Sequence, residues 1–151
     1  MNSWQLSKRL IQVVTLLCFF YFGRSLLHSQ DQVAPVVDDA AKAGKFEEAL
    51  LRRPRTGVAL DRFFSFHSQN GSLEQYCSQL RQRLQSADEN AGTSWCLLGL
   101  MESQRGRDFD AVECLSRAEQ QMPQDALVSF YLARSLNYLG NRPEAVSALQ
   151  R

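Results

Sequence analysis

The sequence has almost no excess of charge of either sign. Its 17 Lys and Arg residues balance 16 Asp and Glu residues, which leaves a net charge near +1. A protein dedicated to nucleic acid needs a clustered basic face. The longest basic cluster here, Arg52, Arg53 and Arg55, is interrupted by Pro54. We therefore expect no nucleic-acid partner.

Residues that could support catalysis are equally scarce. The two histidines are His28 and His67, and His67 follows an aromatic stretch, which is typical of a packed histidine with one satisfied ring nitrogen. Adjacent acidic pairs such as Asp38-Asp39 point to different faces of a helix and cannot easily share a proton or a metal ion. The glycines are isolated rather than gathered in a phosphate-binding loop. The sequence therefore predicts no enzyme activity, no metal site and no cofactor.

The four cysteines match no zinc or redox spacing. Cys18 lies in the apolar N-terminal run, and Cys77, Cys96 and Cys114 follow at intervals of 19 and 18 residues. We expect these last three to be small, buried, apolar side chains on helices. A disulfide between Cys77 and Cys96 in an oxidising compartment is the alternative that the sequence leaves open.

The sequence also lacks an apolar run long enough to span a membrane unaided. The longest uncharged apolar run covers residues 10–23, directly after Lys8 and Arg9. As a helix, its 14 residues extend about 21 Å, against about 30 Å for a hydrocarbon core. Snorkelling of the flanking basic side chains would extend the span to residues 6–27 and make the segment a signal anchor.

A cleaved signal peptide is the competing interpretation of this segment. Gly23 and Ser25 are small residues at the spacing of a cleavage site, so cleavage would follow Ser25. Both interpretations make residues 1–29 a targeting segment and place the rest of the chain outside the cytoplasm, either membrane-associated or exported. A buried helix of a cytosolic protein is the third possibility.

A self-similarity with a period of 34 residues marks the second half of the chain. A unit that begins at Gly92 has apolar, small, glycine and proline residues at characteristic positions. These are Trp95, Leu98, Gly99, Gly106, Ala111, Leu115, Ala118 and Pro123. A second unit, which begins at Ala126, repeats the pattern at Leu132, Ala133, Gly140, Ala145 and Leu149. The small residues allow two antiparallel helices to pack closely, and the central glycine supplies the left-handed conformation that ends the first helix.

These positions resemble the tetratricopeptide repeat (TPR) family. The resemblance implies an all-α fold, in which about four antiparallel helix hairpins form a right-handed solenoid after an N-terminal hydrophobic helix. It covers residues 92–151 as two TPR-like repeats, the last of them incomplete. It covers residues 30–91 only in part, as degenerate TPR-like helical hairpins.

The degenerate region departs from the repeat pattern in an informative way. Residues 41–50 match the turn and the start of the second helix of an earlier unit, with Gly44 in the turn. In the next unit Gly71 matches the turn glycine, but Phe64 and Tyr76 stand where small residues are expected. We therefore expect this hairpin to splay or repack.

The resemblance also implies a binding surface. In TPR proteins, peptides lie in a concave groove lined by the first helices of the hairpins. The matching positions here hold Thr93, Cys96, Leu100, Ser103, Gln104, Leu127, Phe130, Arg134, Asn137 and Tyr138. Of these, we predict the following as partner-binding residues: Cys96, Leu100, Gln104, Phe130, Arg134, Asn137 and Tyr138. The residues with which some family members clamp a terminal carboxylate are absent from these positions.

The predicted function is a protein–protein interaction module, or scaffold, that is tethered to a membrane or exported. The alternatives are a ligand-free structural spacer and the N-terminal part of a larger multidomain protein whose activity lies downstream. Val146 and Leu149 in the last helix would face a following repeat, because each repeat buries its apolar side on its neighbour. We therefore expect a longer repeat protein, or a partner that covers this end.

Overall fold

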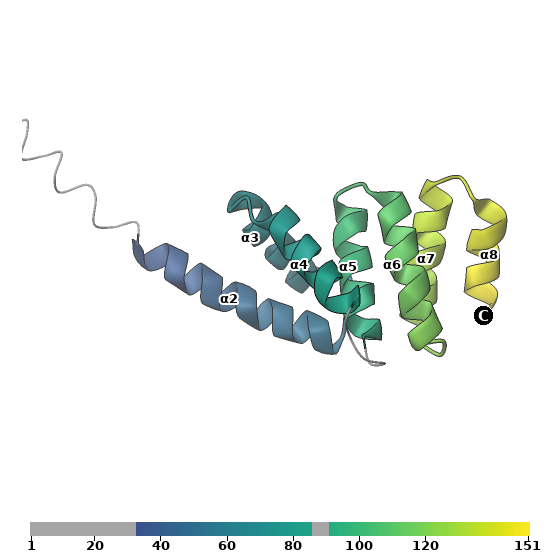
Figure 1. Ribbon diagram of the computed structural model, residues 1–151, viewed down its shortest axis with the longest axis horizontal. Helices are drawn as coiled ribbons and strands as arrows, with labels where there is room; N and C mark the ends of the chain where they lie inside the picture. The colour runs from purple at the N-terminus through teal and green to yellow at the C-terminus, as the bar shows by residue number, and fades with distance from the viewer. Residues whose placement is uncertain (1–32, 86–90) are drawn as a thin grey trace, which may run out of the picture. The chain divides into compact units, whose positions relative to one another are not determined.

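The computed structural model describes residues 33–85 and 91–151, and these residues form helices and no strands. The helices are α2 (Val33–Arg52), α3 (Val58–Gln69), α4 (Leu73–Gln85), α5 (Gly92–Gln104), α6 (Asp108–Gln121), α7 (Ala126–Tyr138) and α8 (Arg142–Gln150) (Figure 1). The predicted all-α class is confirmed for this part of the chain.

The chain divides into two units, Met1–Asp39 and Ala40–Arg151, and helices α3 to α8 lie wholly in the second. The predicted targeting segment at residues 1–29 and the apolar span at residues 6–27 lie outside the described residues. Within residues 33–85 and 91–151, no helix is both long enough and apolar enough to cross a membrane.

Helices α5 and α6 form one close hairpin, and α7 and α8 form a second. The first helices begin at Gly92 and Ala126, the residues at which the two repeat units begin. The turn glycines Gly106 and Gly140 have φ values of 72° and 78°, which confirms the left-handed conformation predicted for them. After each glycine, the next backbone N–H donates to a carbonyl five residues earlier, so both turns are Schellman motifs.

Close approach of α5 and α6 depends on Gly99. A Cβ atom at this position would lie 2.6 Å from Cγ of Leu115 and 3.3 Å from the backbone oxygen of Ala111. Neither distance is compatible with ordinary packing, so only glycine allows this separation of the two helices. Ala111 and Leu115 are fully buried, which places the α5–α6 contact in the core.

The prediction of a turn at Gly44 is wrong. Helix α2 runs through Gly44 without interruption, and Gly44 is not among the glycines with a positive φ. One glycine in a helix costs about 1 kcal/mol relative to alanine, which is too little to end a helix whose other residues favour it. Ala43, Phe46 and Leu50 lie on one face across the glycine, and that face is the one that α2 buries. The described chain therefore contains three hairpins and one single helix.

The α3–α4 hairpin is wider than the other two, as its sequence predicts. Few backbone positions of α3 come near α4, whereas α5 and α6 approach along their length. The contact is made by large side chains instead, with the rings of Phe63 and Tyr76 edge to face at 5.0 Å between centroids. Tyr76 holds the position that carries alanine in the later hairpins, so the backbones cannot close.

His67 sits at the corner of this hairpin. Its Nδ1 lies 2.8 Å from the hydroxyl oxygen of Ser72, and its ring packs against Phe63 and Tyr76. Burial lowers the pKa of His67 from its ordinary value of 6.5, although the carboxylate of Glu47 acts in the opposite direction. The predicted packed histidine with one satisfied nitrogen is confirmed.

We expect acid to destabilise the fold through His67. The unfolded chain takes up this proton at the ordinary pKa of 6.5, whereas the folded chain resists it to a lower pH. The stabilisation present above pH 6.5 is therefore lost as the pH falls through the folded pKa of His67. Urea unfolding between about pH 7 and pH 5 measures this loss. A His67→Gln variant should lose less stability over the same range, and an unchanged pH dependence would contradict the assignment.

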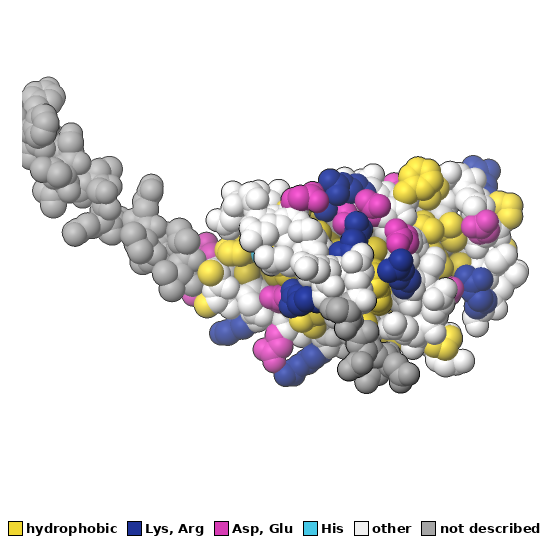
Figure 2. Space-filling model, in the orientation of Figure 1, with side chains coloured by type: hydrophobic (Ala, Val, Ile, Leu, Met, Phe, Trp, Pro, Cys, Tyr) yellow, Lys and Arg dark blue, Asp and Glu magenta, His cyan; other side chains and the backbone are white. Residues whose placement is uncertain are grey.

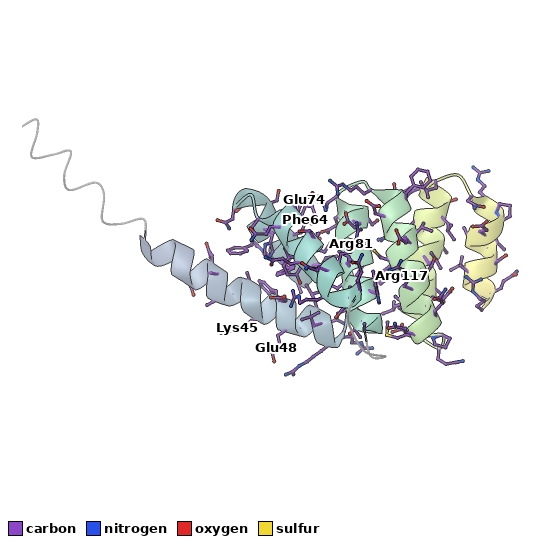
Figure 3. The ribbon with its side chains drawn as sticks, viewed as in Figure 1. Lys45, Glu48, Phe64, Glu74, Arg81 and Arg117 are labelled. Atoms are coloured by element: carbon purple, nitrogen blue, oxygen red, sulfur yellow. The ribbon has the colours of Figure 1, made fainter. Side chains whose placement is uncertain are left out.

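A buried ionic network joins α4 to α5 and to the turn before α6. The side chain of Glu102 is 2% exposed, and its two oxygens accept hydrogen bonds from Arg81 at 3.2 Å and from Arg105 at 3.0 Å. Glu74, at the start of α4, pairs in turn with Arg105 and Arg107. Figure 2 shows acidic and basic side chains gathered over α4, α5 and α6, and Figure 3 marks Glu74 and Arg81 on α4. The network fixes α4 against α5.

Candidate docking surface

The structure separates the predicted partner-binding residues into two groups. On α5, Cys96 and Leu100 are 0% and 1% exposed and belong to the hydrophobic core. Gln104, at the end of the same helix, donates through Nε2 to Asp61 at 2.9 Å. No partner can reach Cys96 or Leu100 without displacing other parts of the chain, so the surface proposed below leaves them out.

Two hydrogen bonds bring segments that precede α5 in the sequence to α5 and α7. Asp61 accepts the hydrogen bond from Gln104, so the first turn of α3 lies at the C-terminal end of α5. The backbone N–H of Thr56 donates to the hydroxyl of Tyr131 on α7 at 3.0 Å. The connection between α2 and α3 thus reaches the first helix of the last hairpin. Of the α5 residues that the family resemblance assigns to a peptide, Cys96 and Leu100 are therefore covered by the chain itself.

The second group lies on α7 and faces outward. Phe130 is 49% exposed and Tyr138 is 66% exposed, which is unusual for large apolar side chains on a well-packed helix. Asn137 is also exposed, and Arg134 is half-buried. Three of these four side chains line one cavity, and Tyr138 lies outside its lining.

The cavity lies between α7 and α8 and has a volume of about 380 Å³. Its wall is mostly apolar, and its lining residues are Phe130, Ala133, Arg134, Asn137, Arg142, Ala145, Val146 and Leu149. We call this set the α7–α8 face. Ala133 and Ala145 form a buried floor, whereas Val146 and Leu149 are more than half exposed at the rim. A hollow of this size with an apolar wall accommodates several side chains of a partner.

Sequence reasoning assigned these residues to different roles. The small residues Ala133 and Ala145 were predicted to bring the two helices together, and Val146 and Leu149 to face a neighbouring repeat. Arg142 was expected in the turn between the two helices and in no binding site. The repeat period is the sequence signal that connects these residues. It places small residues beside large ones on one side of each hairpin, and this arrangement leaves a hollow where no neighbouring helix packs.

Two arginines give the face its charge. No carboxylate in the described part of the chain pairs with Arg134 or Arg142. The Nε of Arg134 is buried and has no hydrogen-bond partner among these residues, and its guanidinium lies 5.4 Å from the ring centroid of Tyr131. A buried guanidinium N–H without an acceptor is costly. The α7–α8 face is therefore basic and incompletely satisfied.

The buried thiols are poorly suited to chemistry. Cys77, Cys96 and Cys114 are free and buried, which confirms the structural role predicted for them and leaves the alternative disulfide unformed. Burial raises the pKa of Cys77 to about 11, of Cys96 to about 12 and of Cys114 to about 11. These thiols therefore stay protonated near neutral pH, and the thiolate is the nucleophilic form. No group of three or more potential metal ligands lies together in residues 33–85 and 91–151.

No protein-family model matches the chain, and the curated proteins contain no sequence match. The α7–α8 face is therefore interpreted from its own geometry.

Proposed function

We propose that this chain is a protein-interaction module of TPR-like hairpins, held at a membrane or exported by its N-terminal segment, whose partner docks on the α7–α8 face. The observation that carries the proposal is the apolar cavity of about 380 Å³ between α7 and α8. Phe130, Val146 and Leu149 around it are exposed, and large apolar side chains gathered at one place on a surface are typical of a binding site.

The proposed binding site differs from the predicted groove, because it lies on α7 and α8 instead of on α5 and α7. Phe130, Arg134 and Asn137 remain in the site because they line the cavity, and Gln104 leaves it because its amide is bonded to Asp61.

The test compares the full chain with two variants as bait in extracts of its source cells. Leu149→Asp places a charge on the α7–α8 face, at a side chain that is 59% exposed. Phe109→Asp is the matched control, because Phe109 is 80% exposed on α6 and lies outside the cavity lining. We expect proteins captured by the wild type and by Phe109→Asp to be lost with Leu149→Asp. Equal capture by all three would reject the α7–α8 face, and capture of no specific protein by any of them would favour the spacer function.

A further inference from the structure

The two close hairpins can be compared position by position, because a shift of 34 residues superimposes their sequence patterns. The shift carries Phe130 and Leu149 of the α7–α8 face onto Cys96 and Leu115 of the α5–α6 hairpin. Cys96 and Leu115 are both completely buried. Helix α7 packs against α6 and approaches α5, so a helix covers the corresponding side of the first hairpin. In Figure 1, α7 stands beside α6, whereas no described helix follows α8.

The dimensions of the α7–α8 face also suit a helix. Its lining residues run from Phe130 to Asn137 on α7 and from Arg142 to Leu149 on α8. Each of these stretches rises about 10 Å, which corresponds to about two helical turns. Apolar side chains at helical spacing on a partner would enter the hollow above Ala133 and Ala145.

The charge of the α7–α8 face distinguishes it from the equivalent side of the α5–α6 hairpin, which α7 covers. Arg134 and Arg142 stand where the α5–α6 hairpin has Leu100 and Asp108. The eight lining residues include these two arginines and no acidic residue. A helix that resembled α7 would bring no carboxylate, because α7 contains none. The face is thus suited to a helix with acidic residues and poorly suited to stacking of a second copy's α7.

We propose that the occupant of the α7–α8 face is an amphipathic helix of a partner protein, whose apolar side fills the cavity and whose carboxylates pair with Arg134 and Arg142. This inference rests on the proposed function, since it names the partner segment for the same site. A carboxylate beside the cavity would give the guanidinium groups of Arg134 and Arg142 an ionic partner, which the acidic side chains of the described residues do not provide. The arginines give specificity and the apolar contacts give most of the buried surface.

The experiment selects binders from a displayed library of 16-residue peptides. The peptides carry fixed leucines at positions i, i+3, i+4 and i+7, and the positions that flank the leucines vary among Glu, Gln and Lys. Selection uses the full chain, and the affinities of the selected peptides are then measured by fluorescence anisotropy. The variants compared are Arg134→Gln/Arg142→Gln, Leu149→Asp and, as the control away from the face, Phe109→Asp. Equal helicity of all variants by circular dichroism is checked first.

We expect Glu to be enriched at the flanking positions of the selected peptides. Their affinity should fall about tenfold or more in the Arg134→Gln/Arg142→Gln variant and should weaken with added salt, while Phe109→Asp changes nothing. Peptides lost with Leu149→Asp but showing no Glu enrichment and no response to the arginine variant would overturn this inference and leave the proposed function intact. Absence of any peptide that depends on Leu149 would overturn both.

Discussion

Replacing Glu102 with alanine is expected to lower the free energy of unfolding by about 3 to 5 kcal/mol, the cost of breaking a buried ion pair by removing one partner. Glu102 is the central acceptor of the network on α5, and its removal leaves Arg105, whose side chain is 10% exposed, without its buried partner. Arg81 and Arg107 are more exposed and can turn toward water, so most of the loss arises at Arg105. Urea unfolding followed by circular dichroism measures the change.

Two further variants show whether the charge of Glu102 causes this loss. Glu102→Gln keeps the side-chain volume and removes only the charge. Its loss of unfolding free energy should therefore be more than half of that of Glu102→Ala. Glu113→Ala is the control, because Glu113 and Arg117 form an exposed pair on α6 at 2.8 Å, and such pairs contribute at most about 1 kcal/mol. Similar small losses for Glu102→Ala and Glu113→Ala would show that the network contributes little to stability.

Introducing valine at Gly99 is the second change with a large expected effect, a loss of about 3 kcal/mol through overpacking. The first added carbon already lies 2.6 Å from Cγ of Leu115, and the backbone oxygen of Ala111 blocks a shift away from it. Helices α5 and α6 must separate or α6 must bend, and either change disturbs the packing of the hydrophobic core between them. Thermal and urea unfolding both report the loss, as a lower Tm and a lower midpoint.

Alanine substitutions at the two helical glycines Gly44 and Gly99 should change the stability in opposite directions. Gly44→Ala is expected to stabilise the fold by about 0.5 to 1 kcal/mol, because a Cβ there meets nothing within 4 Å and alanine favours the helix. Gly99→Ala gains the same helix preference but loses more through its contact with Leu115. Opposite signs of the two changes would support both assignments. A destabilising Gly44→Ala would instead indicate a turn at Gly44.

Local sequence rules predicted part of this fold correctly. Gly106 and Gly140 follow helices of the expected length and precede residues that start new helices, so their left-handed conformation could be read from the chain. Gly44 fits the same local pattern, but its neighbours continue the apolar face of α2 across it. The choice between turn and helix at Gly44 depends on what that face packs against. Such tertiary information is not contained in a ten-residue window.

The candidate site shows the same division. The resemblance to the TPR family implied Phe130, Arg134 and Asn137 as binding residues, and these three line the cavity. It also selected Cys96 and Leu100, which are equivalent positions in the earlier unit and are buried here. The difference arises because α7 packs beside the α5–α6 hairpin, whereas no described helix packs on the corresponding side of the α7–α8 hairpin. The residue types at the repeat positions do not by themselves show whether a neighbouring helix covers them.

The hydrogen bond from Thr56 to Tyr131 joins residues that are 75 positions apart in the sequence. In a regular repeat array each unit touches only its neighbours, so folding can begin at any unit and spread. Here the connection after α2 must meet α7 before the native contacts are complete, which adds the entropy of closing a long loop. This part of the chain should therefore fold more slowly than an array of identical hairpins, and unfold as one cooperative unit rather than hairpin by hairpin.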